Sequence, residues 1–213
     1  LVPGLLPPPV EPAVRAALRD VAVGGDVDDP ATTPGWGEPG LSEAERLMAW
    51  NTLEVLALGA GAPERPVNAI PHTAVAHCQL RFVPGTRWTE LAAIVREHLD
   101  AQGFEDIEVD VIAATPATRL PLDNPWVGWA LDSIERSAGK PATLLPNLAG
   151  SLPNDVFADV LGLPTLWVPH SYPACSQHAP NEHLLAPVAR EGLLMMAGLY
   201  WDLGERAAAP WFQ

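Results

Sequence analysis

His178 is the side chain in this sequence best suited to bind a metal ion. It lies in the run Ser-Gln-His-Ala-Pro-Asn-Glu at 176–182, which follows an apolar segment and precedes a long helical pattern. Ligand-binding residues collect at strand ends in open α/β sheets, and a neutral imidazole nitrogen placed there can bind zinc. On spacing alone, an ordinary surface-loop histidine is the simpler interpretation. We do not expect a self-contained zinc finger, because Cys175 and His178 have no second spaced pair to complete four ligands.

A second possible metal pair, His98 and Asp100, is rejected on geometry. Successive residues of a helix turn by about 100°, so positions two apart point in nearly opposite directions. His98 falls on the apolar stripe of a helix predicted over 89–101, whereas Asp100 faces water. We therefore expect His98 to be a partly buried core histidine.

Two features could bind a carboxylate. Gly150 and Ser151 begin a Gly-Ser-Leu-Pro turn that leads into a predicted helix, where free backbone N–H groups and the helix dipole favour an anion. Ser151 as a plain helix cap explains the turn equally well, and the two roles are compatible. Arg81, on the polar face of a predicted strand, could grip a carboxylate with two parallel hydrogen bonds, although a lone arginine is more often simply solvated.

The predicted secondary structure differs between the first and second halves of the chain. Alternating apolar residues predict a strand over 75–83 with one buried face, and the segments before and after it complete part of a small α+β sandwich. In order, this part reads as strand 51–58, strand 75–83, helix 89–101 ended by Gly103, and strand 107–111. Before it we expect two helices, at 12–21 and from a Ser42–Glu45 capping box to about residue 50.

From residue 115 the pattern is that of an α/β sheet covered by helices on both faces. We expect a helix at 125–137 capped by Asp123 or Asn124, a short strand near Thr143, and a helix at 153–161. An apolar strand at 164–168 and a helix at 184–203, stopped by Gly204, complete this part. The predicted class is therefore α/β, with a partial lid at 1–113 and part of a catalytic domain at 114–213.

Composition narrows the possible partners. The 213 residues have a net charge of −14, which disfavours binding to nucleic acid. No apolar run approaches the roughly 20 residues that span a bilayer, so we expect no membrane partner. The two cysteines, Cys78 and Cys175, cannot form a disulfide framework, which fits a reducing, cytoplasmic location.

Three motifs, taken together, resemble the two-zinc metallopeptidases that include carnosinase, aminoacylase, succinyl-diaminopimelate desuccinylase and the glutamate-releasing carboxypeptidase. Asn-Ala-Ile-Pro at 68–71, followed by Gln-Leu-Arg-Phe-Val-Pro-Gly at 79–85, resembles the family's lid-domain pair. Gly-Ser-Leu-Pro at 150–153 is similar to the Gly-Ser-Ile-Pro turn of the carnosinase-like branch. His-Ala-Pro-Asn-Glu at 178–182 resembles the C-terminal metal motif. The likeness extends over nearly the whole chain from about Trp50, and its specificity rests on the order and spacing of the three motifs.

The resemblance implies a fold and a chemistry. Family members bind two zinc ions, in some cases cobalt or manganese, in a catalytic domain covered by a ferredoxin-like α+β lid that often forms a homodimer. Carried over by motif, His178 would be the last zinc ligand, and Asn68 and Arg81 would reach the substrate carboxylate or the tetrahedral intermediate. Gly150 and Ser151 would bind the C-terminal carboxylate of a small peptide or N-acyl amino acid. The implied reaction is hydrolysis of a peptide or acyl amide bond.

The sequence also departs from the family pattern. It has no adjacent glutamate pair, its one His-x-Asp is the helical pair rejected above, and the lid histidine expected near the scissile carbonyl is missing. All of these precede residue 1 in the family's order. We therefore expect the chain to be an inactive C-terminal fragment of an active parent. The alternative is a non-catalytic dimerisation or binding module related to the same family.

Overall fold

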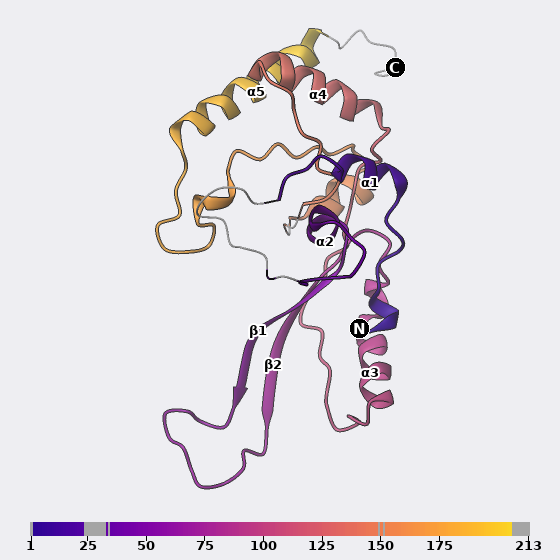
Figure 1. Cartoon of the computed structure of the whole chain (residues 1–213), viewed down its shortest axis with the longest axis vertical. Coiled ribbons are helices and arrows are strands. Elements are labelled where there is room, and N and C mark those ends of the chain that lie inside the picture. The colour runs from indigo at the N-terminus through magenta and orange to yellow at the C-terminus, as the bar shows by residue number, and fades with distance from the viewer. Residues whose placement is uncertain (1, 24–32, 34, 149, 151, 206–213) are drawn as a thin grey trace.

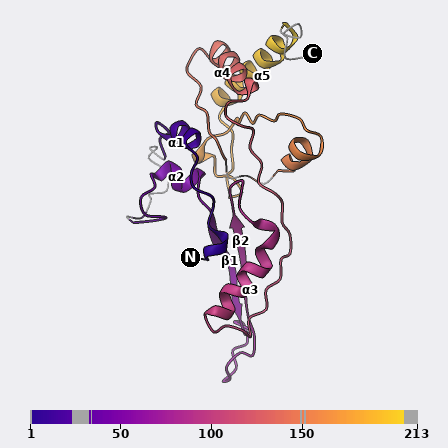
Figure 2. The ribbon, with the colours of Figure 1, turned by 90° about the vertical axis from the view of Figure 1, so that its right-hand side faces the viewer.

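The computed structural model describes residues 2–23, 33, 35–148, 150 and 152–205, in an elongated arrangement (Figure 1). Both views place α4 and α5 together at one end, with the β1–β2 hairpin reaching to the other and α3 beside it (Figures 1 and 2). The elements, with η3 a π-helix and the other η elements 3₁₀ turns, are η1 (Pro3–Leu5), α1 (Pro12–Leu18), α2 (Glu43–Met48), β1 (Thr52–Ala60), β2 (Ala74–Arg81), η2 (Trp88–Glu90), α3 (Leu91–Ala101), α4 (Pro125–Ala138), η3 (Val156–Val160), η4 (Pro173–Cys175) and α5 (Ala186–Glu205).

The predicted helix starts are confirmed where a side chain caps the first turn. Ser42 Oγ accepts a hydrogen bond from the backbone N–H of Glu45 at 3.2 Å, and Glu45 Oε2 accepts one from the N–H of Ser42 at 2.7 Å. Asn124, rather than Asp123, caps α4, which ends at Gly139 in the left-handed conformation. The predicted stop at Gly204 is wrong, because α5 continues to Glu205.

The β1–β2 hairpin confirms the alternation predicted for the second strand. The strands are antiparallel, with a register shift between Val55 and Ala57. At this point β1 contains one extra residue relative to β2. The alternation of apolar residues in β1 also shifts by one position there, so the apolar side chains of both strands stay on the same face of the hairpin. The pairs that share this apolar face are Leu53↔Leu80, Val55↔Cys78, Leu58↔Ala76 and Ala60↔Ala74.

The prediction that this face is buried is wrong for the described residues. Leu53, Val55 and Leu58 remain 63%, 63% and 75% exposed. A two-stranded hairpin has no second layer of its own and is marginal in water unless another element covers it. Among the described helices and strands, only β2 packs closely against β1.

Three predicted strands, at 107–111, near Thr143 and at 164–168, do not form, although the mixed α/β class is confirmed. Alternation and apolarity favour an extended backbone, but a strand also needs a neighbouring edge to pair with. Among the described residues, β1 and β2 pair only with each other. The helix predicted over 153–161 does form, over 154–160, as two α-helical residues followed by the five-residue π-helix η3.

Two small clusters hold the helices in place. Val14 and Leu18 of α1 pack against Ala44 and Ala49 at the ends of α2. At the end of the molecule opposite the hairpin, α4 packs along α5, with Ser133 of α4 fully buried. Within the described ranges, the helices are all too short or too polar to cross a bilayer.

Candidate metal and substrate site

The loop that carries His178 lies between η4 and α5 and has an unusual backbone. Ser176, His178 and Asn181 have φ angles of 60°, 60° and 67°, in the left-handed region that non-glycine residues seldom adopt. The His178 side chain is exposed, and its backbone N–H donates to Glu182 Oε2 at 3.3 Å. The imidazole is therefore presented outward from a tightly turned loop, as a ligand would need to be.

His183, at the end of the same loop, is occupied by internal contacts. Its Nδ1 lies 2.9 Å from the carbonyl oxygen of Asn181, and its Nε2 lies 2.5 Å from the hydroxyl of Tyr172. Because a carbonyl oxygen only accepts, Nδ1 carries the proton of the neutral ring and Nε2 accepts from Tyr172. Neither ring nitrogen of His183 is free to bind a metal while these contacts persist.

The described residues do not assemble a complete zinc site. No group of three or more His, Cys, Asp or Glu side chains among them could hold a metal ion. Zinc takes three or four protein ligands, so His178 alone does not fit a zinc ion. We therefore derive no catalytic step through a metal from the residues described.

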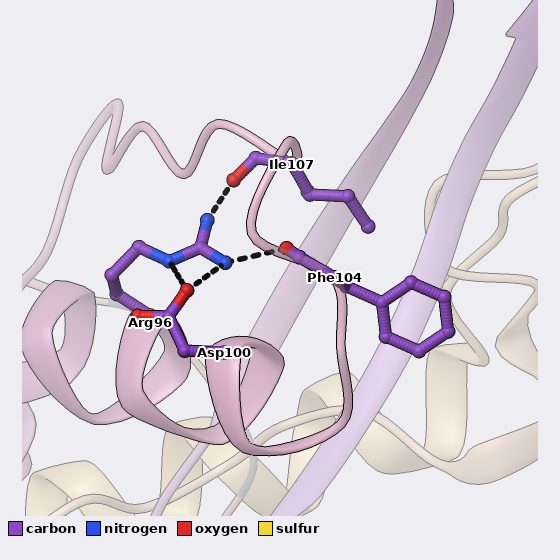
Figure 3. Close-up of polar contacts among 4 residues, drawn as sticks. All are labelled: Arg96, Asp100, Phe104 and Ile107. Atoms are coloured by element: carbon purple, nitrogen blue, oxygen red, sulfur yellow. Dashed lines mark hydrogen bonds and ion pairs between the residues drawn. The ribbon is translucent and has the colours of Figure 1, made fainter.

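The rejection of His98 and Asp100 as a metal pair agrees with the structure. Asp100 pairs with Arg96, whose Nη2 lies 2.7 Å from Asp100 Oδ1, and His98 is half-buried on the other side of α3. Figure 3 shows that the same guanidinium also bonds the carbonyl oxygens of Phe104 and Ile107. Arg96 thus ties the end of α3 to the segment that follows it.

The two predicted substrate-binding residues of the hairpin lie on exposed surface. Arg81 pairs across the sheet with Glu54, with Nε 3.2 Å from Oε1, and both side chains are more than 40% exposed. Asn68 is exposed in the connection between β1 and β2. That connection lies at the far end of the molecule from the loop between η4 and α5 (Figure 1). The structure therefore does not bring Asn68 together with His178 within this chain.

The glycine turn can be described only in part. Gly150 is exposed. Ser151 lies outside the described residues, so both of its predicted roles, as a helix cap and as a carboxylate ligand, stay predictions. The helix-dipole part of the prediction is weakened, because the helical run 154–160 is only seven residues long and carries the carboxylate of Asp155 in its first turn. In the described part of the turn, the exposed Gly150 can still offer its backbone N–H to an anion.

Sequence reasoning missed the residues that anchor this turn. Asn147 donates to the carbonyl oxygen of Met48 at 2.7 Å and accepts from Arg119 at 3.5 Å. Asn154 donates to Thr118 Oγ1 at 2.6 Å, and its Oδ1 accepts from the indole N–H of a tryptophan in the 164–168 segment at 3.2 Å. The adjacent residues Thr118 and Arg119 thus hold both flanks of the turn. Two asparagines flanking a glycine turn were the available sequence signal, but their partners lie 13 to 99 residues away in the sequence.

Comparison with known proteins supports the fold. The sequence matches no protein-family model and no curated protein sequence. Among solved structures, it is similar to the crystal structure of an M20 family metallo-carboxypeptidase from Sulfolobus solfataricus, with a TM-score of 0.69 and 21% sequence identity. The match covers 89% of this chain and 44% of that one, so this chain spans less than half the length of its structural neighbour. The fold of this chain is therefore similar to that of part of an M20 family metallo-carboxypeptidase.

Proposed function

We propose that this chain is part of a metal-dependent hydrolase that cleaves a peptide or N-acyl amino acid amide bond. The observation that carries the proposal is the structural likeness to a metallo-carboxypeptidase over 89% of the chain. The order and spacing of the three sequence motifs support the same proposal.

His178 is the metal ligand that we propose this chain contributes. Support comes from its exposed imidazole and from the left-handed backbone at His178 itself, because such strained positions cluster at functional sites. We propose zinc as the metal, two ions per active site, with cobalt or manganese as alternatives. The remaining ligands and the general base would come from residues outside those described.

We propose that Arg81, Gly150 and Ser151 bind the carboxylate end of the substrate, and that Asn68 reaches it from the hairpin connection. The ion pair of Arg81 with Glu54 is exposed, so it contributes only about 0–1 kcal/mol and a substrate carboxylate can displace it. A flat guanidinium also suits two parallel hydrogen bonds to a carboxylate. Gly150 would contribute its backbone N–H.

We further propose that residues 1–113 form a lid that mediates a homodimer, and that 114–213 belong to the catalytic domain. The exposed apolar face of the hairpin, including Leu53, Val55 and Leu58, supports an interface there. A cytoplasmic location is part of the same proposal, and it is supported by two cysteines that are both free.

The decisive experiment compares His178→Ala with His72→Ala in the full-length gene product. His72 is an exposed histidine in the hairpin connection and serves as the matched control. We expect zinc-dependent hydrolysis of dipeptides or N-acyl amino acids by the wild type. His178→Ala should lose one zinc ion and lower turnover by at least about 100-fold, because losing a ligand affects both metal affinity and the metal-bound water. His72→Ala should change neither quantity.

Two results would count against the proposal. If His178→Ala keeps its full metal content and turnover, His178 is not a ligand. If the full-length wild type binds no metal and hydrolyses no amide substrate, the non-catalytic dimerisation module becomes the better explanation.

A further inference from the structure

The loop from Ser176 to Asn181 holds a conformation that it would not adopt by itself. Three of its six residues have positive φ angles and none of them is glycine. Such conformations persist only where surrounding contacts hold them in place. The question is which contacts of this loop do so.

The contacts converge on His183. Its ring accepts from the Tyr172 hydroxyl at 2.5 Å and stands against the Tyr172 ring in an edge-to-face arrangement, with centroids 5.8 Å apart. Its backbone N–H donates to the carbonyl oxygen of Cys175 at 3.0 Å, and its Nδ1 meets the carbonyl oxygen of Asn181 at 2.9 Å. One residue therefore joins the segment before the loop, at Tyr172 and Cys175, to the end of the loop, at Asn181.

We infer that Tyr172 and His183 form a clasp that closes this loop and fixes the backbone from which His178 projects. They are positioning residues, because neither is proposed to touch metal or substrate. The metal-ligand role of His178 rests on the proposed function, whereas the clasp rests on these contacts alone. One consequence is that His183 is excluded as a ligand while the clasp is closed.

Cys175 provides a direct reporter of the clasp. It is only 3% exposed and lies between the two clasp residues, joined to Tyr172 and His183 by backbone hydrogen bonds at 3.1 and 3.0 Å. The other cysteine, Cys78, is exposed on the hairpin. In a Cys78→Ser background, the rate at which a thiol reagent labels Cys175 therefore measures opening of the loop.

The first arm of the test uses the chain itself. Tyr172→Phe keeps the ring and removes the hydroxyl, and His183→Ala removes the imidazole. Each should accelerate labelling of Cys175 by about 3- to 10-fold, the effect of losing one hydrogen bond. His183→Gln places an amide where Nε2 was and should stay within about 2-fold of the parent. Because Tyr172 is half-buried and His183 exposed, the melting temperatures should be nearly unchanged.

The second arm measures zinc affinity in the full-length gene product. Tyr172→Phe and His183→Ala should weaken zinc binding by about 10-fold, as loss of groups that orient a ligand does, and His183→Gln should restore it. Unchanged labelling in both variants would overturn the clasp. Faster labelling with unchanged zinc affinity would overturn its positioning role. If the wild type binds no zinc, the proposed function fails, while the labelling arm still decides the clasp.

Discussion

Substituting Gly192 tests whether α5 packs tightly against the segment that precedes the His178 loop. A Cβ atom at Gly192 would lie 2.5 Å from Nδ1, 2.9 Å from Cγ and 3.1 Å from Cε1 of His170. These atoms belong to one rigid ring, so the whole imidazole must move. Gly192→Ala is therefore expected to push His170 away from α5.

Two opposing contributions determine how Gly192→Ala changes the free energy of unfolding. Alanine in a helix interior is favoured over glycine by about 0.8–1 kcal/mol. Overpacking a buried site costs about 1–3 kcal/mol, and Gly192 is buried. The net change for Gly192→Ala is therefore a destabilisation of about 0–2 kcal/mol.

The matched control is Gly128→Ala in α4. A Cβ at Gly128 meets nothing within 4 Å, so only the helix preference applies and this variant should gain about 0.8–1 kcal/mol of stability. Urea unfolding of both variants gives the difference directly. In a double-mutant cycle, Gly192→Ala should cost about 0.5–3 kcal/mol less stability in a His170→Ala background than in the wild type, because the clashing ring is gone. If Gly192→Ala stabilises the protein as much as Gly128→Ala does, the close packing of His170 on α5 is not present in solution.

Two further predictions concern residues that join distant segments. Arg96→Lys should lower the free energy of unfolding by about 0.5–1.5 kcal/mol and speed amide hydrogen exchange at 104–107. The reason is that lysine lacks the planar guanidinium that donates to several acceptors at once. Unchanged exchange at 104–107 would refute this role. Asn154→Ala should raise KM by about 2- to 10-fold in the full-length gene product, with little change in kcat or melting temperature, because it frees one flank of the glycine turn. An equal loss in kcat, or an unchanged KM, would contradict a role in positioning that turn.

The sequence by itself determined the elements whose causes are local. The Ser42–Glu45 capping box and the caps of α4 depend on partners no more than four residues apart, so pattern and structure agree there. The two strands of the hairpin were also predicted, β2 from its alternating apolar residues, whereas the bulge in β1 was not. The motif order likewise indicated the fold that the structural comparison supports.

Only the tertiary structure decided which extended segments became strands and which polar side chains met. The segments 107–111 and 164–168 have the composition of strands, but pairing depends on an edge elsewhere, which no local pattern encodes. The anchoring of Asn154 by Thr118 joins residues 36 positions apart, and the clasp of Tyr172 with His183 joins residues 11 positions apart. Such contacts depend on the path of the whole chain, so the sequence could name His178 as a candidate ligand but not the residues that hold its loop in place.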